Sequence, residues 1–218
     1  EAIAAGAQQR SPPHVILLQE VTTRGFHAHL KPHLGAAGFD LFPAVPPDRN
    51  YWELVAYRPP MAFVEGKSEP LWKTQFGRWM HTVRLSLASQ DLTIITAHFD
   101  SGPEPGASAA RKAQARDICG LLEGAALFAG DTNLRDREWK DVAKGLDDVT
   151  DVWEAAGAAP GHRFTWFGHQ KKARFDRAWH GPGLTVFDFQ LFGGDLETGR
   201  DSPSDHLGMR LTLGWALS

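Results

Sequence analysis

The chain has 218 residues, of which 42% are hydrophobic and 22% are charged, with 13 Phe and 8 Trp. Since a single hydrophobic core saturates only at roughly 250–300 residues, we expect one domain covering residues 1–218. The formal net charge of −3 excludes a generally basic surface, so a polyanionic ligand would have to be held by a local patch or a bound cation.

Two further classes of protein are disfavoured by the sequence. No apolar run approaches the roughly 18 residues needed to cross a bilayer, and the opening EAIAAGAQQR has neither the cationic start nor the apolar core of a signal peptide. We therefore expect a monomer without membrane association, cytoplasmic or, in a eukaryote, nuclear. The single cysteine, Cys119, excludes an intrachain disulfide and a Cys-based zinc site. Its apolar neighbours favour a buried structural thiol over a nucleophile.

The first half of the chain predicts mainly strands. Its short apolar runs are rich in β-branched residues and lack polar alternation, which is typical of strands covered on both faces. In chain order we expect a helix at Glu1–Gln9, a strand at His14–Leu18, a helix at Gly25–Leu34, and strands at Phe39–Pro43, Glu53–Tyr57, Met61–Val64, Met80–Leu87 and Leu92–Ala97.

The second half predicts helices between strands. The spacing of Ala115, Ile118 and Leu122 gives one apolar helical stripe. We expect helices at Ala107–Leu122 and Asp136–Lys144, and strands at Leu127–Ala129, Arg174–Trp179, Thr185–Leu191 and Met209–Leu213. Many strands with helices between them indicate two packed sheets covered by helices, a mixed α/β sandwich.

Four polar clusters adjoin apolar strand-like runs, at the positions where a sheet commonly displays functional residues. They are Gln19-Glu20, His98-Phe99-Asp100-Ser101, Asp131-Thr132-Asn133 and Ser204-Asp205-His206. Each cluster alone is more often a solvated strand end. The set as a whole predicts one functional site.

The residue types in these clusters fit metal-assisted phosphoryl transfer. Carboxylate oxygens suit a hard cation such as Mg²⁺, which is often held by one or two protein carboxylates together with substrate phosphate. Glu20 is the first choice for this ligand. An activated water and donors around the phosphorus are also needed, and these are the roles for which Asp131, Asn133, His98 and His206 are suited.

Six strings, in this order, resemble the endonuclease/exonuclease/phosphatase superfamily. They are LQEV (Leu18–Val21), TAHFDS (Thr96–Ser101), FAGDTNLRDRE (Phe128–Glu138), FTW (Phe164–Trp166), RFDR (Arg174–Arg177) and PSDH (Pro203–His206). The string GDTNLRD, followed by DVWE (Asp151–Glu154), FTW and RFDR, resembles in particular the tyrosyl-DNA phosphodiesterase 2 branch. The resemblance spans about residues 14–213.

The resemblance implies a four-layer α/β/β/α sandwich of two mixed sheets and a phosphodiesterase that uses Mg²⁺, with Mn²⁺ as a substitute. It implies 5′-phosphotyrosyl DNA as substrate, at 5′ ends or single-stranded overhangs. The roles it implies are metal binding for Glu20 and Asp205, water activation for Asp131 and Asn133, phosphate contact for His98 and His206, orientation of His206 for Asp176, and substrate contact for Ser101, Arg135, Trp166 and Arg174. For Asp176 and Asp205 a structural ion pair is the alternative.

The chain also departs from the family pattern. Members begin with a strand that ends near an Asn, whereas this sequence opens at EAIAAGAQQRSPP, so we expect the first strand to be missing from the sandwich. Preceding residues, a shortened chain and a natural variant are the alternatives, and we favour preceding residues. The branch has Glu near Asp100, and an acidic residue is expected where Phe167-Gly168 follows FTW, which leaves the shape of the substrate wall open.

Other functions remain open at this stage. A general DNA endonuclease or exonuclease and a small-phosphoester phosphatase would use the same chemistry. An impaired nucleic-acid-binding pseudoenzyme would keep the sandwich without turnover. The basic run Lys171–Arg174 is either a contact to a phosphate backbone or a solvated face.

Overall fold

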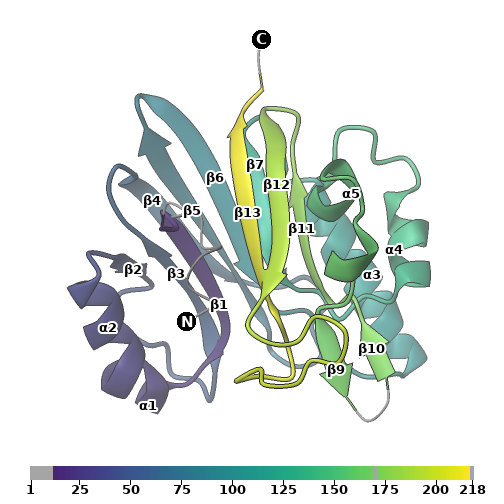
Figure 1. The fold of residues 1–218 in the computed structure, drawn as a ribbon. Coiled ribbons are helices and arrows are strands. Elements are labelled where there is room, and N and C mark those ends of the chain that lie inside the picture. Colours follow the sequence, from purple (N-terminus) through teal and green to yellow (C-terminus); the bar gives the residue numbers. More distant parts are fainter. Residues whose placement is uncertain (1–11, 169–170, 217–218) are drawn as a thin grey trace, which may run out of the picture.

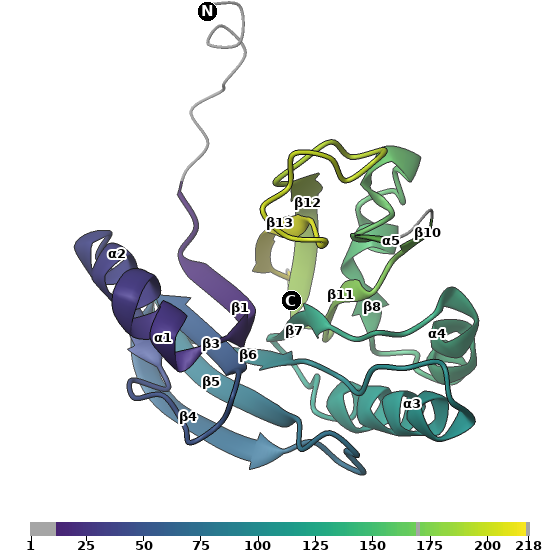
Figure 2. The ribbon, with the colours of Figure 1, turned by 90° about the horizontal axis from the view of Figure 1, so that it is seen from below.

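The computed structural model of the protein describes residues 12–168 and 171–216. The helix expected at Glu1–Gln9 lies outside these residues. Two layers of β-structure pack face to face, and helices lie outside both layers (Figures 1 and 2). This arrangement confirms the α/β/β/α sandwich.

The larger sheet has six strands in the order β4-β5-β6-β7-β11-β8. Only β6 and β7 are parallel, and the other neighbours are antiparallel, so the sheet is mixed. Its strands are β4 (Ala62–Pro70), β5 (Trp79–Leu87), β6 (Gln90–Ala97), β7 (Ala126–Asp131), β8 (Thr150–Asp151) and β11 (Asp176–His180).

The second layer consists of a three-stranded sheet in the order β1-β3-β2 and the hairpin β12-β13. Its strands are β1 (Val15–Val21), β2 (Asp40–Phe42), β3 (Trp52–Tyr57), β12 (Leu184–Phe192) and β13 (Gly208–Trp215). Across the described residues, β1 pairs only with β3 and β13 only with β12. No described strand therefore joins the two parts of this layer.

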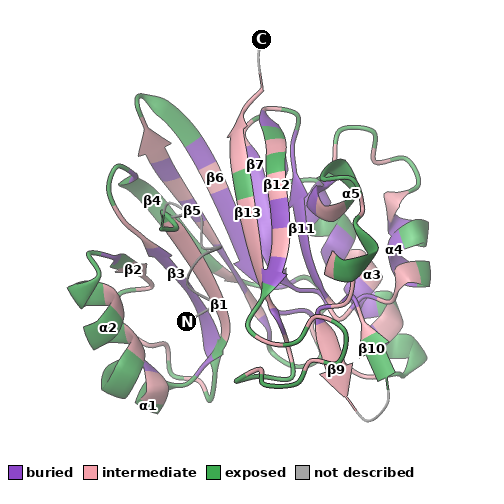
Figure 3. Cartoon of the chain, in the orientation of Figure 1, coloured by how far each residue is buried: buried purple, intermediate pink, exposed green. Residues whose placement is uncertain are grey.

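The six-stranded sheet has a hydrophobic core on each of its faces, because successive side chains of a strand point to opposite faces. On β7, Leu127 and Ala129 face the core between the sheets, whereas Ala126 and Phe128 face the helices. Figure 3 shows β7 and β11 coloured as buried, as expected for strands covered on both faces.

The outer helices cover one sheet each. The helical segment α1 (Thr23–Gly25), η1 (Phe26–Leu30) and α2 (Lys31–Ala36) packs on the β1-β3 sheet through Phe26 against Trp52. On the opposite side, α3 (Pro105–Cys119) and α4 (Asp136–Ala143) cover the six-stranded sheet, where the Trp139 and Trp179 rings stack at 4.5 Å. Among the described residues, no helix is long and apolar enough to span a membrane.

Several local features differ from the expectation or refine it. The segment 25–34 contains a π-helical turn rather than one continuous helix. The short helix α5 (Val152–Ala155), the 3₁₀ turn η2 (Pro160–His162) and the hairpin of β9 (Trp166–Gly168) and β10 (Lys171–Ala173) were not predicted. Cys119 is buried, as expected, and burial raises the pKa of its thiol to about 12.

The parallel pair β6-β7 brings two of the polar clusters together. At Gly130 a Cβ atom would lie 2.2 Å from the backbone oxygen of Ala97, so only glycine permits this close approach. One residue further along, His98 and Asp131 form a parallel bridge. The GD pair of the motif thus places a carboxylate beside an imidazole.

Candidate active site

Four side chains from separate strand ends form a continuous series of contacts. Glu20 Oε1 lies 3.6 Å from His98 Nδ1, and His98 Nε2 lies 3.2 Å from Asp131 Oδ2. The same oxygen of Asp131 lies 4.0 Å from His206 Nε2. The structure therefore gathers residues that are almost two hundred positions apart in the chain at one edge of the two sheets.

Asp131 is the buried carboxylate at the centre of this series. Its Oδ1 accepts a hydrogen bond from the backbone N–H of Asn133, whose φ of 50° is unusual for a residue with a side chain. Burial, followed by the nearby Asp176 carboxylate, raises the pKa of Asp131 to about 7. A pKa near the working pH is the property that a general base needs.

His98 is a buried neutral imidazole. Burial lowers its pKa to about 3, and the positive charges of Arg78 and His206 act in the same direction. Asn133 Nδ2 lies 3.2 Å from His98 Nε2. When that amide donates to Nε2, the ring proton lies on Nδ1, an atom that faces Glu20 and has no hydrogen-bond partner within the described parts of the chain.

His206 is the positively charged member of the site. Its Nδ1 lies 2.7 Å from Asp176 Oδ2. Burial alone would lower the pKa, but the hydrogen bond to Asp176 and the attraction of Asp131 and Asp205 outweigh it and raise the pKa of His206 to about 9. An imidazolium at this position suits the stabilisation of negative charge on a phosphate.

Two groups of the site offer ligand atoms of the kind that a cation needs. Atoms of Asp131, Asp176 and His206 also lie within 4.8 Å of one another and form a second group of possible ligands, in which His206 Nδ1 already contacts Asp176 Oδ2 at 2.7 Å. Glu20 sits in a β-bulge with φ of 56° and 63% of its side chain exposed. Its free carboxylate fits a hard divalent cation.

In the loop after β6, Asp100 forms hydrogen bonds that hold the loop, and its side chain does not take part in the site. Asp100 is fully buried, and its oxygens accept from Thr74 Oγ1 at 2.8 Å and from the Gln75 backbone N–H at 2.6 Å. The buried Arg111 donates to the Asp100 carbonyl oxygen. Asp100 therefore anchors the loop, and the partly buried Ser101 follows it.

Arg135 and Trp166 flank the Asp131–His206 side. Arg135 precedes α4, donates to the Asn133 carbonyl oxygen at 3.3 Å and lies over the Phe175 ring. The Trp166 ring packs at 5.3 Å against the same Phe175, and its Nε1 donates to Asp205 Oδ2 at 2.9 Å. These contacts place a cation and an aromatic side chain next to the site, and their roles as substrate contacts stay predictions.

The structure does not bring Arg174 to the site. Its side chain is 4% exposed, and its guanidinium pairs with Asp151 and lies 4.5 Å from the centre of the Trp153 ring. These contacts indicate a structural role for Arg174, and the substrate contact that the resemblance implies stays a prediction. In the motif RFDR, Arg174 forms a buried ion pair with Asp151, and Asp176 contacts the ring of His206 and orients it.

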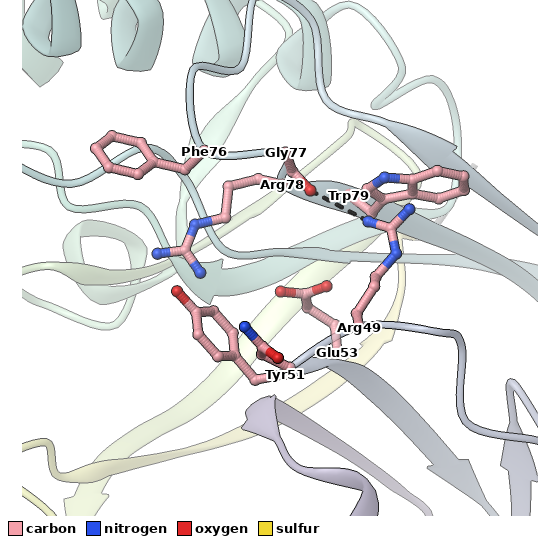
Figure 4. A pocket seen from close by; sticks show the side chains of 8 residues that line it. Arg49, Tyr51, Glu53, Phe76, Gly77, Arg78 and Trp79 are labelled. Carbon is pink, nitrogen blue, oxygen red and sulfur yellow. Dashed lines mark hydrogen bonds between the residues drawn. The ribbon is translucent and has the colours of Figure 1, made fainter.

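A pocket of about 240 Å³, whose residues the sequence analysis did not single out, is lined by Arg49, Tyr51, Glu53 and Arg78 among others. Arg78, from the segment before β5, lies over the Tyr51 ring at 5.0 Å, and its Nε and Nη1 have no hydrogen-bond partner in the described part of the chain. Because Met80 pairs with Ala97, Arg78 and His98 lie at the same end of β5 and β6. Figure 4 shows Glu53 directed into this pocket between Arg49 and Arg78.

The two-sheet sandwich and the cluster of carboxylates and imidazoles at its edge are typical of a hydrolase that acts on phosphoesters. The sequence profile of the Endonuclease/Exonuclease/phosphatase family matches residues 4–206. The chain belongs to this family. It is 29% identical over 224 residues to Tyrosyl-DNA phosphodiesterase 2 of Bos taurus and 30% identical over 223 residues to that of Mus musculus. Both alignments cover 92% of this chain but only 59% and 57% of those relatives.

Solved structures agree with this assignment. A crystal structure of D. rerio TDP2 complexed with single strand DNA product has a TM-score of 0.78 and 29% identity, and covers 93% of this chain and 86% of that chain. Truncated Caenorhabditis elegans TDP2 has a TM-score of 0.72 at 25% identity, covering 94% and 85% of the two chains. The human Nocturnin catalytic domain has the same TM-score of 0.72 at 17% identity, with 94% and 82% covered, and shares the fold.

Proposed function

We propose that this protein is a Mg²⁺-dependent phosphodiesterase that hydrolyses 5′-phosphotyrosyl bonds at DNA ends, acting as a monomer. The observation that carries the proposal is the contact series Glu20, His98, Asp131 and His206 at one sheet edge. It combines a free carboxylate, a neutral imidazole, a general base and a cation within one site, which is the set that phosphodiester hydrolysis needs.

In this proposal Asp131 and Asn133 orient the attacking water. The Asp131 carboxylate accepts the proton of that water, and its pKa of about 7 matches this role near neutral pH. The imidazolium of His206 donates Nε2–H to a phosphoryl oxygen, while the contact with Asp176 holds its ring. His98, as a neutral donor, contacts a second phosphoryl oxygen or supports Glu20.

The donor set fits Mg²⁺ through Glu20, with Asp205 as a second carboxylate near the substrate wall. A bound Mg²⁺ would supply neutralisation of the charge that develops on the phosphoryl group. Asp205 has one oxygen engaged by Trp166, which leaves the other free. Mn²⁺ is the expected substitute because it accepts the same oxygen ligands.

Two features favour an aromatic leaving group. A phenol, with pKa near 10, departs more readily than an alkoxide and needs no strong general acid. The pocket beside Glu20 and His98 has aromatic walls and the guanidinium of Arg78, whose Nε and Nη1 have no hydrogen-bond partner among the described residues, which suits a ring whose oxygen becomes negative. The single-stranded DNA product bound to the D. rerio relative supports DNA as the other part of the substrate.

A comparison of three substrates tests the proposal. We expect kcat/KM for a 5′-tyrosyl single-stranded oligonucleotide to exceed that for an abasic-site duplex and for an inositol polyphosphate. A preference for either of the other two would assign the same chemistry to a nuclease or a phosphatase. Absence of Mg²⁺-dependent turnover on all three would support the pseudoenzyme alternative.

A further inference from the structure

Glu53 is a buried carboxylate that the proposed chemistry does not use. It is only 3% exposed, at the start of β3, and it lines the pocket together with Arg49, Tyr51 and Arg78. Figure 4 shows the carboxyl group between the two guanidinium groups, yet no ion pair within 4.0 Å joins Glu53 to either arginine in the described structure. The charges therefore face a shared open space rather than being neutralised in direct contact.

The pocket lies on the side of the site where a leaving group departs. Asp131 contacts His98 through Nε2, and Glu20 approaches the opposite nitrogen, Nδ1. Glu53 is on the Glu20 side, since Val21 pairs with Trp52 and the two carboxylates repel each other. In phosphoryl transfer the attacking and leaving oxygens are roughly in line, so a water held by Asp131 places the leaving group toward this pocket.

The rest of the pocket is held firmly, so that its charges keep their positions. Arg49 Nη1 donates to the Gly77 carbonyl oxygen at 3.1 Å, and its guanidinium lies 3.7 Å from the centre of the Trp79 ring. Arg78 is buried over Tyr51. With Glu53 ionised, the charges of Arg49, Arg78 and Glu53 sum to one positive charge. With Glu53 neutral or replaced by a neutral residue, they sum to two.

We propose that Glu53 is a specificity-determining residue that tunes the choice of leaving group by charge, because it weakens the attraction of Arg49 and Arg78 for groups that carry further negative charge. The proposal rests on the proposed phosphodiesterase function and deepens it. A leaving strand of ordinary DNA brings additional phosphates into the pocket, whereas a tyrosine side chain brings a neutral ring. Arg49 and Arg78 alone would attract those phosphates. By weakening this attraction, Glu53 disfavours cleavage within a DNA strand.

The test uses three thymidine 5′-phosphate aryl esters whose phenols differ only in a remote charge: tyramine (cationic), N-acetyltyramine (neutral) and 3-(4-hydroxyphenyl)propionate (anionic). At pH 8, above the pKa of about 7 to which burial raises Glu53, kcat/KM for the three esters gives the cation-to-anion ratio of the wild type. In Glu53→Gln we expect the cation-to-anion ratio to drop by about tenfold or more, the scale of one charge contact at a few ångströms.

Two controls separate charge selection from general damage. Glu53→Asp keeps the charge and should keep the cation-to-anion ratio, and Asp48→Asn removes an acidic group at the rim of the adjoining pocket and should also keep it. Thermal unfolding of each variant checks that it is folded. Turnover with a cation-to-anion ratio unaffected by Glu53→Gln would overturn the inference alone, whereas no turnover of any ester would overturn the proposed function and the inference with it.

Discussion

His206 Nδ1 donates to Asp176 Oδ2 at 2.7 Å, and the opposite ring nitrogen faces Asp131 Oδ2 at 4.0 Å. One carboxylate therefore orients the ring and holds its proton, and the other lies where an attacking water would be activated. The register of the sheet creates this arrangement, because Asp176 on β11 pairs with Asp131 on β7.

The first prediction concerns the charge of His206. The variant Asp176→Asn should lower the pKa of His206 from about 9 toward its ordinary value of 6.5. Because the folded-state pKa is raised, the stabilisation from this pair is fully present below pH 6.5 and is lost as the pH rises through about 9. An NMR titration of the imidazole in EDTA, assigned with His206→Gln, measures the shift, and an unchanged pKa in the variant would show that Asp176 does not control the proton.

The second prediction separates catalysis from folding at Asp131. Asp131→Asn should lower kcat by at least about 100-fold, the scale for losing a positioned general base. The melting temperature should not fall, because a neutral amide replaces a buried carboxylate whose pKa is raised. Single-turnover rates and thermal unfolding provide the two measurements. The exposed Asp117→Asn serves as the control, and a rate for Asp131→Asn within threefold of wild type would remove the general base from the account.

The third prediction tests the buried ion pair of Arg174. Replacement by Met leaves the buried carboxylate of Asp151 with Arg177 Nη1 at 3.8 Å as its remaining cation, so Arg174→Met should destabilise the fold by about 3 kcal/mol, the lower end of the range for breaking a buried ion pair. The KM for an oligonucleotide should stay unchanged, because the side chain of Arg174 is 4% exposed. Lys171→Met, at an exposed position near by, is the matched control for stability. A raised KM with unchanged denaturant unfolding would restore Arg174 as a substrate contact.

The fourth prediction addresses the aromatic wall. Trp166→Ala should weaken binding of a single-stranded product oligonucleotide by about 1–3 kcal/mol, the usual size of base stacking on an aromatic side chain. Trp166→Phe keeps a ring but loses the hydrogen bond to Asp205, so most of the affinity should remain. Equal losses in both variants would indicate that the contact to Asp205, and not stacking, explains the effect.

The sequence predicted the sheets and most of the site because both depend on local patterns. Apolar β-branched runs marked the strands, and polar clusters at their ends marked Glu20, His98, Asp131 and His206. The Gly130 contact shows why the GD pair is so informative, since it fixes both the approach of β6 to β7 and the position of the carboxylate.

The remainder depended on long-range pairing that local patterns do not contain. Arg174 and Arg135 both lie in family motifs, yet only the structure shows that Asp151 binds the first. The pocket residues Tyr51, Glu53 and Arg78 come from segments with no motif, and the packing of β3 near β5 brings them together. The sequence signal that could have indicated this pocket is Glu53, the one charged residue in the otherwise apolar strand β3.

Metal-dependent hydrolysis of a 5′-tyrosyl oligonucleotide tests the central claim most directly. We expect turnover in Mg²⁺ or Mn²⁺ that falls by at least about 100-fold in excess EDTA, because a bound divalent cation would supply most of the neutralisation of the developing charge. Glu20→Gln at saturating substrate should require a higher Mg²⁺ concentration for half-maximal rate. Undiminished turnover in EDTA, with Glu20→Gln as active as wild type, would contradict the account.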